Sequence, residues 1–366
     1  MRIVHISDCY FPRVGGIETQ VRAVAQRQVA AGHEVTIITA TPGEGPQDAG
    51  VTVVRLDANL PLGTPAHPRG IALIRDALAQ VTPDIVHVHA GVVSPFAWMG
   101  IEAAKDVPTV VTVHSMWGPI SQRAFAANLA DWQQRRFVLT AVSDVSAAAV
   151  RRALKADMPV LLTPNAIDVD FWRETRPVAH DDVHIVATLR FSPRKRIMTL
   201  MKALRDVRGW LPADVRMRAT IMGDGSLMPQ VRHFMIREQL DWVRLPGRIT
   251  PEELRDIYAH ADVFVQPTVR ESFGIAALEA RAAGLPVIGM AESGLTEFIV
   301  DGIDGTLADS DAALAGALQR MIRDSVTRER IAAHNRANAP KFTWEYALAA
   351  LDEAYAAAKA RFEGAA

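Results

Sequence analysis

The sequence predicts an α/β protein with two doubly wound domains, each built around a parallel sheet. Short β-branched runs alternate with longer amphipathic stretches along both halves of the chain, and the alternation is interrupted once, over residues 166–183. The length of 366 residues corresponds to two or three domains, at ~100–200 residues each. Alternating strands and helices favour parallel sheets, because each parallel connection needs a crossover segment.

The first half opens with a strand at residues 2–6, a Pro/Gly loop and a helix whose apolar positions from Val21 to Val29 recur at helical spacing. Gly32 stands where a glycine commonly ends a helix. Further strands are expected at residues 34–39, 51–56, 84–89, 109–114 and 138–142, and a second helix at 69–80. These strands are almost continuously apolar, which is typical of strands covered on both faces.

The second half repeats this pattern after the interruption. Strands are expected at residues 184–189, 217–222, 243–245, 263–266 and 287–289, and helices at 198–207, 226–238, 251–259, 275–283 and 342–362. Thr250 is expected to cap the helix that follows it. The predicted organisation is a first domain at residues 1–165, a connector at 166–183, a second domain at 184–340 and a C-terminal helix at 341–366.

Composition excludes several classes of protein. Hydrophobic residues make up 49% of the chain, too many for a disordered protein. The 40 Lys and Arg residues balance 41 Asp and Glu residues, which argues against a nucleic-acid-coating protein. The single cysteine, Cys9, excludes an intramolecular disulfide and a four-cysteine zinc site. No signal peptide is evident and no apolar run reaches the ~18–20 residues that span a bilayer, so a cytoplasmic location is expected.

Loops that follow strands are the expected place for a site, because ligands of doubly wound sheets bind beyond the carboxyl ends of the strands. Two such domains also imply a cleft between them. Gly15 and Gly16 follow the first strand and lead into a helix, whose N-terminal N–H groups suit a phosphate or a sugar hydroxyl. A tight turn that merely requires glycine explains the pair equally well.

Neither glycine cluster of this kind continues into a cofactor fingerprint. The segment Gly223–Gly225 is followed by Met228 where the dinucleotide motif requires its third glycine, and no P-loop sequence occurs in the chain. Nicotinamide or flavin oxidoreductases and P-loop NTPases therefore lose support.

Charged residues follow two strands of the second half. Arg190 and Lys195 could neutralise a diphosphate, although a solvated basic turn is an equally good explanation on spacing alone. Glu271 precedes a predicted helix that contains Glu279, and two carboxylates there could accept hydrogen bonds from the hydroxyls of a sugar and a ribose. The alternative is an ordinary acidic helix start and a surface glutamate, which the apolar neighbours of Glu279 disfavour.

Three histidines fall near strand ends in the first half. His87 and His89 share one face of a predicted strand because they are two residues apart, and His114 ends the next strand. They could bind a metal ion, but no carboxylate or cysteine at ligand spacing reinforces such a site. We expect no metal, and a substrate contact for His114.

Taken together, these motifs resemble the retaining glycosyltransferases of family 4, also called glycosyltransferase group 1. The most specific segment is ESFG at residues 271–274 with Glu279, followed by AGLPV at 283–287. The similarity extends over most of the chain and includes PRVGGIE at 12–18, GHEV at 32–35, VH at 113–114, VS at 142–143, TPNAID at 163–168, GDG at 223–225 and PGR at 246–248.

The resemblance implies the GT-B fold, in which two Rossmann-like domains face each other across a cleft and the last helix returns to the N-terminal domain. The N-terminal domain would be the acceptor side and the C-terminal domain the nucleotide-sugar side. Family members transfer a sugar with retention of anomeric configuration, by front-face attack through an oxocarbenium-like state that needs no enzyme nucleophile.

The resemblance also assigns roles in the second domain. Arg190 and Lys195 would hold the donor diphosphate and stabilise the leaving nucleotide, which a metal ion does in other transferases. Glu279 would bind the donor ribose, and Glu271 would contact the transferred sugar.

Further contacts are implied by the same resemblance. The backbone around Phe273 and Gly274 would meet the sugar and the phosphates. Gly15 and Gly16 would approach the donor phosphate from the first domain, and His114 would contact the sugar or the acceptor. The expected reaction moves a hexosyl group from GDP-mannose or a UDP-sugar to a lipid, glycan or small-molecule acceptor, with no metal or other cofactor and no nucleic-acid partner.

The chain departs from the family pattern in two places. Arg196 follows Lys195 where the family often has glycine, which leaves the loop geometry open, and Ala166 replaces another common glycine. Neither change removes a charge that the mechanism needs. A nucleotide-sugar epimerase of the same fold and a non-catalytic two-domain binding protein remain as alternatives.

Two other segments carry weaker functional signals. Asp168-Val169-Asp170 is similar to the D-x-D metal motif of another glycosyltransferase class, but it lies in the connector rather than after a core strand. Residues 120–155 are basic, and this region could contact anionic lipid at the inner face of a membrane or form a solvated helical face. The residues concerned are Arg135, Arg136, Arg151, Arg152 and Lys155, with Trp117 and Trp132 nearby.

Overall fold

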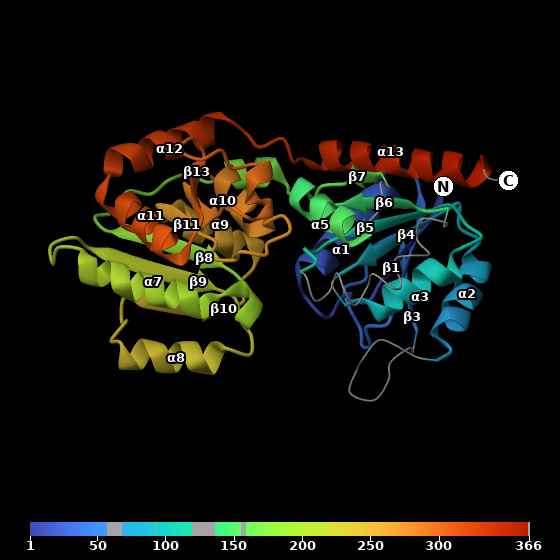
Figure 1. Ribbon diagram of the computed structural model, residues 1–366, viewed down its shortest axis with the longest axis horizontal. Helices are drawn as coiled ribbons and strands as arrows, with labels where there is room; N and C mark the ends of the chain where they lie inside the picture. Colours follow the sequence, from blue (N-terminus) through green and yellow to red (C-terminus); the bar gives the residue numbers. More distant parts are fainter. Residues whose placement is uncertain (57–67, 92, 119–135, 155–158, 365–366) are drawn as a thin grey trace. The chain divides into compact units, whose positions relative to one another are not determined.

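The computed structural model describes residues 1–56, 68–91, 93–118, 136–154 and 159–364. It divides into two compact units (Figure 1). Unit 1 comprises Met1–Ala166 together with Trp344–Ala366, and unit 2 comprises Ile167–Thr343. Each unit is an α/β structure with its own parallel sheet.

The sheet of unit 1 has seven parallel strands in the order β3-β2-β1-β4-β5-β6-β7. The strands are β1 (Arg2–Ser7), β2 (Glu34–Thr39), β3 (Val51–Arg55), β4 (Ile85–Ala90), β5 (Thr109–Val113), β6 (Val138–Ala141) and β7 (Val160–Leu162). The order reverses direction at β1, which pairs with both β2 and β4. The loops after β1 and β4 therefore diverge at a topological switch point, where doubly wound sheets bind ligands.

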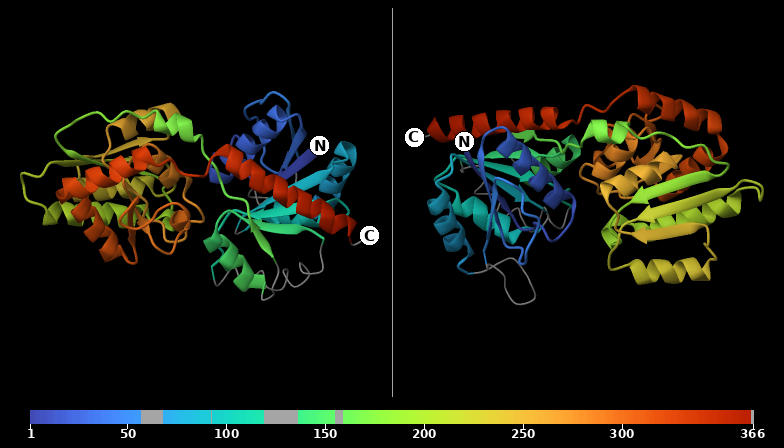
Figure 2. Two further views of the ribbon diagram at one scale, coloured as in Figure 1. Left: turned by 90° about the horizontal axis from the view of Figure 1, so that it is seen from above. Right: turned by 180° about the vertical axis from the view of Figure 1, so that it is seen from behind.

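Helices cover both faces of this sheet. The helices are α1 (Gly16–Ala30), α2 (Gly70–Val81), α3 (Pro95–Ala103), α5 (Asp144–Leu154) and α13 (Trp344–Glu363). Apolar residues of α2, α3 and α5 pack on one face. On the other face, α1 packs on β2 and α13 packs on the central strands, as Figure 2 shows for the red helix at the end of the chain.

Unit 2 contains a six-stranded parallel sheet in the order β10-β9-β8-β11-β12-β13, with its switch point between β8 and β11. Its strands are β8 (Val183–Thr188), β9 (Met217–Met222), β10 (Val243–Gly247), β11 (Val263–Val265), β12 (Val287–Met290) and β13 (Gly305–Ala308). Its helices are α6 (Val169–Arg173), α7 (Ile197–Trp210), α8 (Met228–Arg237), α9 (Pro251–Ala259), α10 (Ile275–Ala282), α11 (Asp311–Arg323) and α12 (Ser325–Ala337), with 3-10 turns η2 (Pro193–Lys195) and η3 (Gly294–Glu297).

Most predicted strands and helices are present within one or two residues of their expected ends. Thr250 caps α9 in a full capping box with Glu253. The segment expected to be an irregular connector contains the short helix α6, and Asp168 is its N-cap, accepting a hydrogen bond from the N–H of Phe171. That helix cap is a structural explanation for the D-x-D sequence. Across the described ranges, no helix is both long and apolar enough to span a membrane.

Candidate active site

Lys195 and Glu271 meet at the switch point of unit 2. Because β8 and β11 are neighbours in the sheet, the loops that follow them leave its carboxyl edge side by side. Nζ of Lys195 lies 2.6 Å from Oε2 of Glu271. The glutamate side chain is 10% exposed and the lysine side chain 32% exposed. The arrangement presents a cation to solvent while its partner carboxylate is held inside the loop.

The loop between β8 and Lys195 is supported by the glycines of the neighbouring loop after β9. A Cβ on Gly223 would lie 1.9 Å from the carbonyl oxygen of Leu189, and one on Gly225 would lie 2.4 Å from that of Phe191. Gly223 also has a φ of +123°, a conformation that strongly favours glycine. These glycines therefore let two backbones touch, and the loop so supported carries the exposed side chain of Arg190.

Arg196 stands where the family often has glycine, and its backbone and side chain define the loop geometry there. Its backbone is left-handed, with φ 59° and ψ 34°, so the turn keeps the conformation that glycine favours. Its Nη1 donates to the carbonyl oxygen of Pro267 at 3.0 Å, and its Nη2 donates to a carboxylate oxygen of Asp311 at 2.6 Å. The side chain thus ties the turn that carries Lys195 to the loop after β11 and to the start of α11.

Phe273 and Gly274 lead directly into α10. Gly274 has a φ of +95° and a Cβ there would lie 2.6 Å from Leu295. Its lack of a side chain leaves α10 without a side-chain cap, so its first N–H groups point out of the helix start. Phe273 is buried and packs edge-on against Phe342, with ring centroids 5.1 Å apart. The Gly274 turn is therefore shaped by glycine and anchored by a buried ring.

Glu279 lies on α10, half-buried beside Tyr258 of α9. Burial raises the pKa of Glu279 to about 8. The pKa of Tyr258 is also raised, mainly by burial and further by the charge of Glu279. The Tyr258 hydroxyl lies 3.4 Å from the hydroxyl of Thr188 at the end of β8. A neutral carboxyl at pH 7 is a group whose charge a ligand can change.

Gly15 and Gly16 begin α1 in unit 1. Gly15 is the N-cap, with an extended φ of −169°, and no side chain caps the helix. Neither glycine has a positive φ. The turn therefore does not require glycine for its conformation, and this weakens the purely structural explanation for the pair. The missing side-chain cap leaves an open helix start beside the switch point of the sheet.

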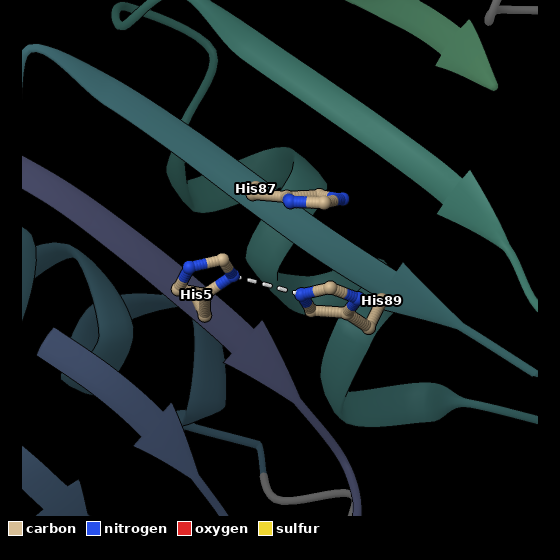
Figure 3. Close-up of side chains that lie close together, drawn as sticks. All are labelled: His5, His87 and His89. Atoms are coloured by element: carbon tan, nitrogen blue, oxygen red, sulfur yellow. Dashed lines mark hydrogen bonds between the residues drawn. The ribbon is translucent and has the colours of Figure 1, made fainter. Parts of the chain in front are cut away.

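His114 follows β5 immediately, and its Nε2 lies 2.9 Å from Nδ1 of His89. Burial lowers the pKa of His114 to about 4. Among the described residues, His5, His87 and His89 form a group that could hold a metal ion, because one ring nitrogen of each lies within 4.8 Å of those of the other two (Figure 3). The sequence predicts a grouping of His114 with His87 and His89 but not the place of His5, because only the register of β1 on β4 puts His5 opposite His87.

The basic region considered as a lipid contact is only partly described. Arg135, Trp132 and Lys155 lie outside the described residues. Trp117 is 3% exposed and belongs to the core of unit 1, so it is no membrane anchor. The Arg136 guanidinium lies over the ring of Phe362.

One element of the unit 2 site went unnoticed in the sequence. The loop after β12 ends in η3, and the N–H of Gly294 donates to the carbonyl oxygen of Glu271 at 2.8 Å. A Cβ on Gly294 would lie 2.2 Å from the carbonyl oxygen of Ser272. The sequence signal was the pair Ser293-Gly294, which two residues separate from the end of the short apolar strand β12.

Comparisons with known proteins agree with this architecture. A model of the glycosyl transferases group 1 matches residues 182–324, and a model of glycosyltransferase family 4 matches residues 14–171. The D-inositol 3-phosphate glycosyltransferase of Xylanimonas cellulosilytica is 29% identical, over 98% of this chain and 91% of its own. The phosphatidyl-myo-inositol mannosyltransferase of Mycobacterium leprae is 26% identical, over 97% of this chain and 96% of its own.

Solved structures show the same fold. A glycosyltransferase from Rickettsia africae has a TM-score of 0.76 at 17% identity and covers 98% of both chains. Anabaena HepE in complex with UDP-glucose has a TM-score of 0.73 at 18% identity and covers 98% of this chain and 100% of its own. With its two Rossmann-like units in the GT-B fold and the two family models spanning both of them, the chain belongs to the group 1, or family 4, glycosyltransferases.

Proposed function

We propose that the protein is a retaining, metal-independent glycosyltransferase that moves a hexosyl group from a nucleotide-diphosphate sugar, GDP-mannose or a UDP-sugar, to an alcohol acceptor. The observation that carries this proposal is the Lys195–Glu271 pair beside the uncapped start of α10. A cation, a buried carboxylate and outward N–H groups at one sheet edge suit a sugar linked to a diphosphate.

In this proposal, Lys195 and Arg190 stabilise the negative charge that develops during the transfer. As the bond between the sugar and the diphosphate breaks, negative charge builds on the leaving phosphate oxygen. Lys195 and Arg190 stabilise that charge, and preorganised cations make the largest contribution where they meet developing charge. Lys195 then exchanges or shares its bond to Glu271, which frees a carboxylate oxygen to accept from a sugar hydroxyl.

Glu279 binds the ribose. It sits one α10 turn beyond the phosphate-binding start of the helix, and a carboxylate there accepts from two vicinal hydroxyls. Front-face attack by the acceptor on the oxocarbenium-like sugar requires no enzyme nucleophile, so retention follows without a covalent intermediate.

The acceptor is assigned to unit 1. His114 provides an imidazole beside the switch point of that unit, whereas Gly15 and Gly16 leave the start of α1 open to a phosphate, which the family resemblance assigns to the donor. Two relatives are named for inositol 3-phosphate and phosphatidyl-myo-inositol. We therefore put phosphorylated inositol, free or as a lipid headgroup with peripheral membrane contact, first among small-molecule, lipid and glycan acceptors.

A ligand screen tests the donor side. Thermal unfolding is measured with UDP, GDP, UDP-glucose and GDP-mannose, each with and without EDTA. A ligand at 100 times its Kd adds about 2.7 kcal/mol of stability. We expect a shift with one nucleotide family that EDTA leaves unchanged. A shift that EDTA abolishes contradicts metal independence, and no shift with any nucleotide contradicts the donor site.

Product analysis tests the reaction. With the binding donor and inositol phosphate, or liposomes that contain phosphatidylinositol, Lys195→Met should lower kcat about 10²–10³-fold, as removal of one charge-stabilising donor does. Lys202→Met, on the exposed face of α7, is the matched control and should stay active. NMR of the product reports anomeric configuration. A changed donor sugar without acceptor would indicate an epimerase, and tight donor binding without any product would indicate a binding protein.

A further inference from the structure

A band of polar side chains crosses the α13-covered face of the unit 1 sheet. At the amino ends of four adjacent strands this face is apolar, with Ile3, Ile85, Val110 and Val138 packed under α13. Two residues further along the same strands, the face carries His5, His87, Thr112 and Thr140, all buried. The same layer could have stayed apolar, so the change to hydrogen-bonding groups toward the carboxyl ends calls for a reason.

The first branch of this band ends at His114. Oε1 of Gln28 faces Nε2 of His5 at 2.7 Å, Nδ1 of His5 faces Nε2 of His89 at 2.9 Å, and Nδ1 of His89 faces Nε2 of His114 at 2.9 Å. Figure 3 shows the link between His5 and His89 from adjacent strands.

An amide oxygen only accepts, so the chain has one consistent proton arrangement. His5 donates from Nε2 to Gln28 and must therefore accept at Nδ1. His89 then donates from Nε2 and accepts at Nδ1, and His114 donates from Nε2. Which ring nitrogen carries the proton is set by the bond that the other nitrogen makes. In His114 the result is an Nδ1 that accepts.

A second branch leaves the same glutamine and, among the hydrogen bonds of the described residues, follows a different route from the one to His114. Nε2 of Gln28 donates to the hydroxyl of Tyr355 on α13 at 3.0 Å, and that hydroxyl lies 3.1 Å from Nδ1 of His87. Nε2 of His87 lies 2.7 Å from the hydroxyl of Thr112. His87 and His89 thus share a strand, a face and full burial, but only His89 lies on the route to His114.

A metal ion is the competing explanation for the His5, His87 and His89 cluster. Each of the six ring nitrogens already has a hydrogen-bond partner within the chain. A metal ion would break bonds in both branches, whereas the hydrogen bonds account for every nitrogen without one.

We infer that Gln28, His5 and His89 are positioning residues that hold His114 as the Nε2–H tautomer, in which Nδ1 is an acceptor; the contact of His114 with a substrate hydroxyl belongs to the proposed function. The identity of that hydroxyl, on the transferred sugar or the acceptor, rests on the proposed function, whereas the tautomer does not. Burial lowers the pKa of His5 and His114 to about 4 and lowers that of His89. The route is therefore neutral at pH 7, and it conveys orientation and tautomer rather than charge.

NMR of the full-length protein labelled with 15N-histidine tests the tautomer without any substrate. Imidazole 15N shifts and couplings at pH 7 distinguish the protonated nitrogen, and the His114 signals are identified by their loss in His114→Ala. We expect Nε2–H in the wild type, loss of the unique tautomer in His89→Leu, and retention in His87→Leu, the matched control. Retention of Nε2–H in His89→Leu, or equal loss in both variants, overturns the inference.

Two further variants keep the test decisive if His89→Leu does not fold. Gln28→Leu removes the acceptor at the far end, and we expect it to mix the tautomers of His114. His89→Gln keeps a donor for His5 and an acceptor for His114, and we expect it to restore the wild-type tautomer. If the tautomer of His114 is unchanged in Gln28→Leu and lost in His89→Gln, the route is not the one described.

Transfer kinetics separate this inference from the proposed function. His89→Leu should lower kcat/KM about 3–10-fold, the effect of one misdirected hydrogen bond, while the Kd for UDP or GDP stays unchanged and His87→Leu keeps wild-type kcat/KM. If the NMR results are as expected but His114→Ala does not change kcat/KM, the proposed substrate contact is refuted and the tautomer inference stands. Stoichiometric zinc, nickel or iron by elemental analysis of the purified protein, lost in both leucine variants, would establish a metal site and refute the hydrogen-bonded route.

Discussion

If Glu279 binds the donor ribose as we propose, the affinity for nucleotide sugars should depend on pH. Burial raises the pKa of this carboxyl to about 8, so it is mostly protonated at pH 7 in the free protein. A ribose with two vicinal hydroxyls is bound best by the carboxylate, which accepts from both. If only the ionised form binds, the apparent Kd is the intrinsic Kd divided by the ionised fraction. That fraction is about 0.01 at pH 6, about 0.1 at pH 7 and about 0.9 at pH 9, so affinity should rise about 90-fold over this range.

Calorimetric titration with UDP-glucose and GDP-mannose measures the effect. The diphosphate of a nucleotide sugar is a diester and does not titrate between pH 6 and 9, so it contributes nothing to the pH dependence. At pH 7, buffers of different ionisation enthalpy should reveal about 0.9 protons released per ligand bound. Glu279→Gln should bind more weakly at pH 9, with an affinity that no longer varies with pH. A pH-independent wild-type affinity, or the same slope in the variant, would refute the assignment of Glu279 to the ribose.

The same carboxyl affects stability in the opposite direction. The folded-state pKa of about 8 lies above the unfolded value of 4.5, so the native state holds a proton that the unfolded state has lost between these pH values. Stability is therefore expected to fall as pH rises from 4.5 to 8 and to level off above 8. Glu279→Gln should remove this slope in denaturant-unfolding curves.

Three other substitutions test the geometry of the units. Gly223→Ala should lower the free energy of unfolding by about 3 kcal/mol, or Tm by about 6–12 °C, because its Cβ would meet the carbonyl oxygen of Leu189. Gly209→Ala is the control, because a Cβ there has open space and should change Tm little. Equal losses of Tm in the two variants would contradict the close approach. Arg196→Ala should be about 1 kcal/mol less stable than Arg196→Gly in urea unfolding. Both variants lose the ion pair, but only alanine keeps the strain of a positive φ. Equal stabilities of the two variants would argue against a left-handed turn. Tyr355→Phe leaves two buried polar partners without their hydroxyl and should cost about 1–3 kcal/mol, and an unchanged unfolding curve would contradict the hydrogen bonds assigned to α13.

Strands were readily predicted from the sequence because buried parallel strands are continuous apolar runs. The strands at Glu34–Thr39 and Met217–Met222 have the expected ends. The segments that were missed include the three-residue β7 and the five-residue α6, too short to show a period. The missed α11 did carry a signal: Ser310 caps it, and Leu314, Leu318 and Met321 follow at helical spacing.

The site was predicted in part. Residue type and position after a strand singled out Lys195 and Glu271, which lie 76 positions apart. Their pairing could not be predicted, because it depends on β8 lying next to β11 in the sheet. The raised pKa of Glu279 depends on the packing of α10 near Tyr258, and the role of Arg196 depends on Asp311, far along the chain. Local sequence thus indicates which groups carry chemistry, whereas sheet order determines which of them meet.

The helix α13 makes unit 1 discontinuous in sequence, and this determines the order in which the two units can fold during translation. Without Leu351, Ala354 and Ala358, the apolar ends of β1, β4, β5 and β6 would face water. A ribosome that has finished Ala166 must still add about 180 residues before α13 emerges, which takes about 10–40 s at ~5–20 residues per second. Unit 2 is continuous and can complete its fold first. The first domain to be translated is therefore the last to be completed, and during that delay the strand ends that α13 will cover stay exposed.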